Sequence, residues 1–229
     1  MMKKKLSLSV VRLFQRFIKY LGSFCLLFNV CSIAAPVSGG LFTQEAIVDE
    51  PLEPSCSVSA PENGYEFSQL HASLFQSKST TALPPMSQTW QVICSAPISA
   101  LFLTIDADVQ SNSLSDADPT HFGLGMVNGQ GHLGYFQVTL DNATVDGRSV
   151  QLYQTTNQTS VTPAQSSFLL KPTAFYGWTQ DGKVPEKGQQ YSVNVTVSPT
   201  LYSLKETQGP LVDGAELDGE LVLTFPFGI

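Results

Sequence analysis

The sequence predicts an all-β protein built as a sandwich of two sheets. Three observations lead to this class. Short runs that alternate apolar and polar residues follow one another between turn residues, and no stretch keeps a helical period for ten residues with a cap at each end. Two cysteines are also placed so that they can tie two early strands together. About 195 residues follow an N-terminal leader, which is the size of one domain.

Residues 1–34 have the composition of a secretory signal peptide. Basic residues precede an apolar run of about 13 residues, and Ser32-Ile33-Ala34 offers the small-x-small pattern that a signal peptidase recognises. We expect cleavage after Ala34. The apolar run is shorter than the roughly 20 residues of a membrane-spanning helix. The long basic stretch before it leaves a permanent membrane anchor as the alternative.

The charge of the chain changes when this leader is set aside. Six of the 12 basic residues and none of the 19 acidic residues lie in residues 1–34. The rest of the chain therefore has six basic against 19 acidic residues, a net charge of −13. Nucleic acids and anionic membranes bind clustered Lys and Arg, so we expect neither as a partner and membrane contact only during export.

Residues 35–55 predict an extended arm in front of the domain. The arm contains Gly39-Gly40, four carboxylates, and Pro51 and Pro54 just before the first cysteine of the domain. A proline disfavours helical geometry in the residue before it, so this stretch favours an extended chain. The domain itself is expected at residues 56–229.

Cys56 and Cys94 are the two cysteines that remain after the leader, and they lie 38 positions apart. In an exported chain this pattern predicts a disulfide between neighbouring strands, with Cα atoms about 5–6 Å apart. The bond would close a loop of about 40 residues and stabilise the fold by about 3–4 kcal/mol in the chain-entropy model. Two buried free thiols are the alternative.

The strands of the domain are expected in order along the chain. A β-rich run at 101–106 is followed by a polar loop at 110–120. The run 132–140 alternates, with Leu133, Tyr135, Gln137 and Thr139 on one face and Gly134, Phe136, Val138 and Leu140 on the other. Asp146-Gly147 predicts a turn before a strand at 150–153.

Two later strands have the clearest alternation. Residues 191–197 place Tyr191, Val193, Val195 and Val197 on one face. In the last strand, Leu221, Leu223 and Phe225 face one way, and we expect these side chains inward, against residues such as Val193 and Val195.

The chain has no pattern typical of an enzyme. His71, His121 and His132 lack metal-ligand spacing, although His121 and His132 could meet across a hairpin. The acidic residues at 106, 108, 116 and 118 could hold calcium, but they lack the glycine and glutamate of an EF-hand loop, which favours solvated loop charges. The glycines at 123–134 indicate tight turns and close strand packing. We expect no catalytic residue, metal or cofactor.

The chain resembles a known family in its central motif. Phe122-Gly123-Leu124-Gly125, followed by Gly134-Tyr135 in a strand, is similar to the motif of the bacterial fimbrial-like proteins catalogued as domain of unknown function 1120. The early cysteine pair, the Asp146-Gly147 turn and the Leu-Asp-Gly before the last strand also fit that family. The resemblance covers roughly residues 55–227, nearly the whole domain.

The resemblance implies an incomplete immunoglobulin-like sandwich of the kind found in pilus subunits. In that case a periplasmic chaperone supplies the missing strand, an usher assembles the fibre, and a neighbouring subunit then donates its N-terminal arm. Leu221, Leu223 and Phe225 would form the edge of the acceptor groove, and Phe42, Ala46 and Val48 of the arm would fill a neighbour's pockets. The expected location is the cell surface, in a fimbria, after export through the periplasm.

Two features differ from a repeating shaft subunit. The arm alternates poorly and is rich in carboxylates, and the chain ends Phe227-Gly228-Ile229 without a nearby tyrosine. They leave a tip, minor or terminal position open. A second hypothesis is a self-contained exported domain that binds carbohydrate or protein, in which Trp178, Tyr176 and Phe175 would provide a stacking surface. The alternative for Trp178 is a place in the core.

Overall fold

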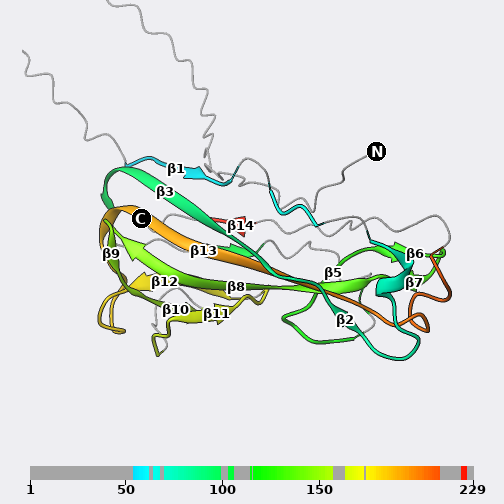
Figure 1. Ribbon diagram of the computed structural model, residues 1–229. Helices are drawn as coiled ribbons and strands as arrows, with labels where there is room; N and C mark the ends of the chain where they lie inside the picture. The colour runs from blue at the N-terminus through cyan, green and yellow to red at the C-terminus, as the bar shows by residue number, and fades with distance from the viewer. Residues whose placement is uncertain are drawn as a thin grey trace, which may run out of the picture. The chain divides into compact units, whose positions relative to one another are not determined.

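The computed structural model shows an all-β sandwich, as the sequence predicts (Figure 1). The predicted signal peptide and nearly all of the predicted arm lie outside the residues that it describes. No helix in the described part of the chain is long and apolar enough to cross a membrane. The described residues are 54–61, 64–67, 70–98, 103–105, 114, 116–156, 163–172, 174–211 and 223–225.

The strands form one large sheet, one small sheet and a two-stranded ribbon. The large sheet has the order β1-β3-β13-β8-β11, the small sheet has the order β10-β12-β4-β14, and β6 pairs with β7. A short 3-10 helix covers Ala72–Leu74. The strands are β1 Cys56–Ser59, β2 Thr81–Ala82, β3 Met86–Ile98, β4 Leu103–Ile105, β5 Phe122–Gly123, β6 Met126–Val127, β7 Gly131–His132, β8 Gly134–Val145, β9 Arg148–Ser149, β10 Gln151–Thr155, β11 Ser167–Leu169, β12 Phe175–Thr179, β13 Gly188–Leu201 and β14 Leu223–Thr224.

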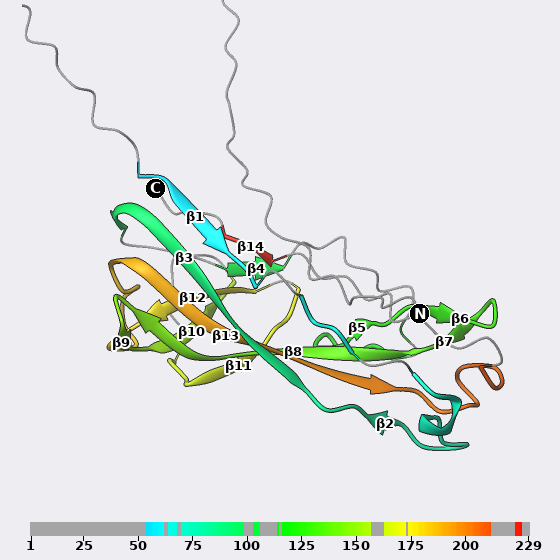
Figure 2. The same cartoon turned by 45° about the horizontal axis from the view of Figure 1, so that its top comes forward.

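Three long antiparallel strands, β3, β8 and β13, form the centre of the large sheet (Figure 2). Their side chains alternate between a buried apolar face and an outer face of hydroxyl and amide groups, because successive residues of a strand point to opposite sides. Cross-strand hydrogen bonds link the outer face, for example from Thr89 Oγ1 to Asn194 Oδ1 at 2.7 Å. The buried face includes Trp90, Val92, Phe136, Val138, Leu140, Tyr191, Val193, Val195 and Val197.

The predicted alternation of residues 132–140 is confirmed for Phe136, Val138 and Leu140, which are buried, but it is wrong for Leu133. Leu133 is fully buried, although it was expected on the same face as Tyr135, Gln137 and Thr139, which are half-buried. The cause is Gly134, whose φ of 158° interrupts the regular pleat between the two residues. A second irregularity follows at Asn142, where a positive φ of 49° accompanies a register shift against β13, as in a β-bulge.

The Asp146-Gly147 turn is present as predicted and joins β8 to β9. Both residues have positive φ, 49° and 76°, as a two-residue type I′ hairpin turn requires. Asp146 Oδ1 also accepts hydrogen bonds from the backbone N–H groups of Gln190 at 2.9 Å and Gln189 at 3.0 Å. These bonds hold the pKa of the Asp146 carboxyl below its ordinary value. The turn therefore anchors the start of β13 as well as reversing the chain.

One long side of the sandwich is closed by hydrogen bonds between its two layers. Leu152 of β10, in the small sheet, exchanges two backbone hydrogen bonds of 2.9 Å with Gln165. The chain then continues into β11, which pairs with β8 of the large sheet. On this side, the segment from Gln165 to Leu169 therefore hydrogen-bonds to the small sheet at one end and to the large sheet at the other.

Candidate interaction site

The predicted disulfide is present and joins β1 to β3. Cys56 and Cys94 lie directly opposite each other, with Cα atoms 4.0 Å apart, closer than the expected 5–6 Å. The reason is their register. The backbone N–H of Ser95 donates to the carbonyl of Ser55 at 2.8 Å, so the cysteines occupy the adjacent non-hydrogen-bonded pair, where Cα atoms approach most closely. The bond fastens the edge strand β1 to the centre of the sheet.

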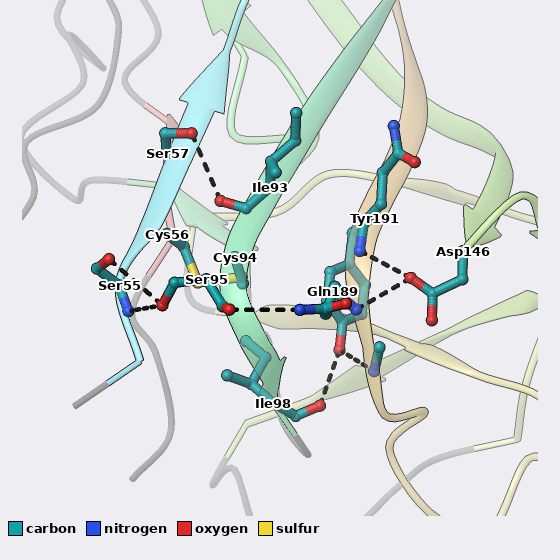
Figure 3. The surroundings of a disulfide bond; sticks show 12 residues. Ser55, Cys56, Ser57, Ile93, Cys94, Ser95, Ile98, Asp146, Gln189 and Tyr191 are labelled. Carbon is teal, nitrogen blue, oxygen red and sulfur yellow. Dashed lines mark hydrogen bonds between the residues drawn. A yellow bond between two sulfur atoms is a disulfide. The ribbon is translucent and has the colours of Figure 1, made fainter. Parts of the chain in front are cut away.

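Polar contacts from β13 hold the end of β3 beside this disulfide (Figure 3). Gln189 Nε2 donates to the carbonyl of Ser95 at 3.3 Å, and the Tyr191 hydroxyl donates to the carbonyl of Ile98 at 3.0 Å. The Tyr191 hydroxyl also accepts from the N–H of Gly188 at 3.0 Å, and burial raises its pKa to about 12. These contacts hold the end of β3, the strand with which β1 pairs, against β13.

Two edge strands, β1 and β14, lie on the same side of the sandwich in both views (Figures 1 and 2). β1 ends the large sheet and β14 ends the small sheet. Among the residues that the structure describes, β1 pairs with β3 alone and β14 with β4 alone. We call this side, defined by Cys56–Ser59 and Leu223–Thr224, the edge-strand side. It lies opposite the side that Gln165 and β11 close.

Two of the three side chains predicted to face inward from the last strand lie among the described residues, and both point into the core. Leu223 is 0% exposed and Phe225 is 3% exposed, and both belong to the core cluster that contains Val193 and Val195. Leu221 lies outside the described residues, as do the arm residues Phe42, Ala46 and Val48. The roles of these residues in a groove and a donor arm stay predictions.

The residues of the glycine-rich motif meet in one β-hairpin. Phe122 pairs with Phe136 and Gly123 with Tyr135, and the same register continues through β6 and β7. Between these pairs, the Leu124 N–H donates to the Gly134 carbonyl at 3.0 Å. The motif therefore specifies a hairpin that covers residues 122–136, with Phe122 and Leu124 buried in the core.

Two glycines of this hairpin allow another segment of backbone to come very close. A Cβ on Gly131 would lie 2.2 Å from the Thr207 carbonyl oxygen, and one on Gly134 would lie 2.2 Å from the Thr200 oxygen. At the tip, Asn128 Nδ2 donates to the same Thr207 carbonyl at 2.7 Å. The expectation of close packing is thus confirmed at residues 131 and 134, whereas Gly129 serves the turn with a φ of 81°.

A polar and aromatic cluster, which the sequence did not predict, fastens the segment before this hairpin. His121 stacks on Tyr135, with ring centroids 3.6 Å apart, and its Nδ1 lies 2.9 Å from Asp116 Oδ1. The Tyr202 hydroxyl donates to Asp116 Oδ2 at 2.7 Å. Burial disfavours the charged form of Asp116, but hydrogen bonds from Tyr202, the Asp118 N–H and His121 outweigh it and hold the pKa below its ordinary value.

The neighbouring carboxylate, Asp118, is used within its own loop. Its Oδ1 accepts from the N–H of Thr120 at 2.8 Å and from the Thr120 hydroxyl at 2.7 Å. These bonds hold the pKa of Asp118 below its ordinary value. No group of three or more His, Cys, Asp or Glu residues in the described segments is arranged to hold a metal ion. Asp106 and Asp108 lie outside those segments.

The hairpin does not bring His121 and His132 together. His121 stacks on Tyr135, whereas His132 pairs with Met126 further along the hairpin. The surface at Trp178 that the second hypothesis required is also not formed. Trp178 is 3% exposed and Tyr176 0%, and the Trp178 Nε1–H donates to the Ser192 carbonyl at 2.9 Å. Both residues are part of the core because β12 packs its aromatic side chains against β13.

The Asp116, His121 and Tyr202 cluster had no local signal in the sequence, since its members are up to 86 positions apart. A scan of the chain against protein-family models found no match, and a search of curated proteins found no similar sequence. The resemblance to the fimbrial-like family therefore stays a prediction, carried by the hairpin motif.

Proposed function

We propose that this protein is an exported structural or adhesive subunit of a bacterial surface fibre, assembled by strand exchange on the chaperone–usher route. The observation that carries the proposal is the edge-strand side, where β1 and β14 end the two sheets on one side of the sandwich while the other side is closed. We also propose that the sandwich lacks one strand, which a partner supplies.

An edge strand is a template for another strand. Its free N–H and C=O groups can pair with an extended segment, while alternate side chains of that segment fill pockets between the sheets. In this protein such a segment would lie beside β14, where Leu223 and the following residue Phe225 already face the core. Exposed edges also promote aggregation, so a chaperone would have to cover this edge before assembly.

The disulfide fits this route. Disulfides persist in oxidising compartments, so the bond between Cys56 and Cys94 indicates an exported protein. We propose that the protein passes through the periplasm and is located in a fimbria at the cell surface. The partners would be a periplasmic chaperone, an usher and neighbouring subunits.

The test is deletion of residues 36–52 in a strain that makes the fibre. If the arm is a donor, the truncated domain should still form its disulfide and bind its chaperone, but it should not pass a strand to the next subunit. Fractionation of sheared fibres and native mass spectrometry of the periplasmic complex measure both steps. Truncated protein found in fibres at normal levels, with subunits attached on both sides, would contradict the donor role.

The full mature chain tests the acceptor role separately. A domain that lacks a strand should aggregate or remain bound to a chaperone when purified, whereas a closed binding domain should be a stable monomer. Size-exclusion chromatography with light scattering distinguishes the two. A stable monomer that resists denaturation and binds no chaperone would contradict the proposal and favour a self-contained binding domain.

A further inference from the structure

The tip of the hairpin at residues 122–136 is fastened to the turn that follows β13. The loop between β6 and β7 contains Asn128, whose side-chain amide donates to two carbonyl oxygens of that turn. The first belongs to Thr207, at 2.7 Å, and the second to Gly209, at 3.2 Å. Both views show the two segments side by side (Figures 1 and 2). We call these two hydrogen bonds the Asn128 latch.

The Asn128 latch depends on the side chain being a hydrogen-bond donor. An amide NH₂ group can donate two hydrogen bonds, which matches the two carbonyl oxygens of the turn, whereas a carboxylate can only accept. A carboxylate in place of the amide would form neither bond and would set a negatively charged oxygen against two carbonyl oxygens. The contact with Thr207 is partly buried, so water would compensate this loss incompletely. Conversion of the amide to a carboxylate therefore opens the latch.

The residue after Asn128 makes this amide prone to such a conversion. It is Gly129, which has no side chain to keep its own backbone nitrogen away from the side chain of the preceding asparagine. Gly129 has a φ of 81°, and a Cβ placed on it would meet nothing within 4 Å. The space beside its α-carbon is therefore open, and the attack of its nitrogen on the Asn128 side chain is not blocked by a neighbouring segment.

We propose that Asn128 is a site of spontaneous deamidation, and that this modification releases the hairpin tip irreversibly. The backbone nitrogen of Gly129 gives its proton to solvent and attacks Cγ of Asn128, so that a new C–N bond closes a succinimide ring. The Cγ–Nδ2 bond breaks, and the leaving nitrogen takes up a proton and departs as ammonia. Water then opens the ring at one of its two carbonyls, which gives aspartate or isoaspartate. This inference is independent of the proposed function.

The latch also controls when the reaction takes place. While it is closed, the Asn128 side chain is held against the turn after β13, so the attack requires the tip to open. Two more hydrogen bonds resist this opening. Gln208 Nε2 donates to the Gln130 carbonyl at 3.3 Å, and the His132 N–H donates to the Glu206 carbonyl at 3.0 Å. Opening of a surface hairpin needs less free energy than global unfolding, and the product cannot close the latch again.

Peptide mapping by mass spectrometry tests the reaction in the full mature chain, incubated folded and in urea at the same pH and temperature. Asn63-Gly64 is the same dipeptide elsewhere in the chain and serves as the reference. In urea the two sites should convert at similar rates, and Gly129→Ala should slow the conversion of Asn128. In the folded chain Asn128 should convert more slowly, and Gln208→Ala, which removes a hydrogen bond at the tip, should speed it by about threefold.

Two results of this mapping would overturn the proposal. The first is Asn128 that stays intact in the folded chain long after the reaction in urea is complete. The second is an unchanged rate in the Gln208→Ala variant, because the reaction would then not depend on opening of the tip.

The variant Asn128→Asp reproduces one product and tests the release of the tip. Hydrogen exchange of the His132 amide should become at least about tenfold faster, because both bonds of the latch are lost and a repulsive contact replaces them. Asn142→Asp is the matched control. Asn142 is exposed, has the same φ of 49° as Asn128, and lies in β8, outside the latch. It adds the same charge and should leave the exchange of His132 unchanged.

A third variant separates the loss of the latch from the added charge. Asn128→Gly allows the positive φ and removes only the side chain, so it should speed the exchange of His132 by about threefold, less than Asn128→Asp does. It also replaces Asn128→Asp if that variant does not fold. Equal acceleration by Asn142→Asp and Asn128→Asp would show a general charge effect and overturn the latch. Unchanged exchange in both variants of Asn128 would overturn it as well.

Discussion

Replacement of Leu223 with alanine is expected to destabilise the domain by about 2–5 kcal/mol. Leu223 is 0% exposed in β14 and belongs to the main core cluster. The substitution removes three carbon atoms, and the transfer term of about 0.8 kcal/mol for each methylene already gives about 2.4 kcal/mol. The cavity that remains adds to this value, up to the upper limit. Because β14 is an edge strand and can shift inward, we expect the lower half of the range.

The free energy of unfolding can be followed by urea titration of the oxidised mature chain. Trp90 and Trp178 are 2% and 3% exposed, so their fluorescence should change when the core opens. With a slope of about 1–3 kcal/mol per molar urea, the expected loss moves the midpoint by about 0.7–3.5 M. Ile93→Ala is the matched control. Ile93 lies on the outer face of β3 and is 48% exposed, so its loss should be less than half as large.

A loss below about half a kcal/mol for Leu223→Ala would refute the reasoning, since a fully buried leucine cannot be removed from a packed core at so small a cost. It would mean that β14 does not pack in this register. A large loss for Ile93→Ala together with a small one for Leu223→Ala would mean that the inward and outward faces of the sheets have been exchanged.

Three further predictions address the disulfide, the hairpin and the acid stability. Cys94→Ser should cost about 2–4 kcal/mol in the same urea titration, and alkylation of both cysteines in an unreduced extract would contradict the bond. Gly134→Ala should destabilise the domain far more than Gly129→Ala, because a Cβ at residue 134 would lie 2.2 Å from a backbone oxygen. A Cβ at residue 129 has open space and meets only the positive-φ penalty of about 1 kcal/mol. Equal losses of stability would contradict the close approach at Gly134. Asp116 has a lowered pKa in the folded state, so its contribution to stability is present above the ordinary carboxyl pKa and is lost as the pH falls through the lowered value. Asp116→Asn should therefore weaken the pH dependence of the urea midpoint between about pH 5 and pH 2. An unchanged pH dependence would contradict the pairing of Asp116.

Features that depend on neighbouring residues were predictable from the sequence. The alternation of residues 191–197 corresponds to the buried face of β13, and the Asp146-Gly147 pair forms the turn that its conformational preferences require. The partnership of Cys56 and Cys94 followed from the number of cysteines once the leader was set aside. Each of these predictions used a rule that acts within a few residues or through a covalent bond.

Features that depend on distant backbone were not predictable. The glycines at 131 and 134 indicated close packing, but nothing near them in sequence identified the segment at 200–207 as the neighbour. The place of Leu133 was predicted wrongly because a strand rule assumes a regular pleat, and Gly134 breaks it. Trp178 could have been a surface platform or part of the core, and only its contact with β13 decided for the core.

The sequence by itself determined the class of this protein, since strand periodicity, turn dipeptides and the charge balance are local or additive properties of the chain. It also predicted that Leu223 and Phe225 face the core. Only the tertiary structure decided which strands of the described chain lie at the edges, and it placed β1 and β14 on one side of the sandwich. Strand order arises from contacts between residues up to 120 positions apart, such as Thr104 and Thr224, whose energies no short window of sequence contains.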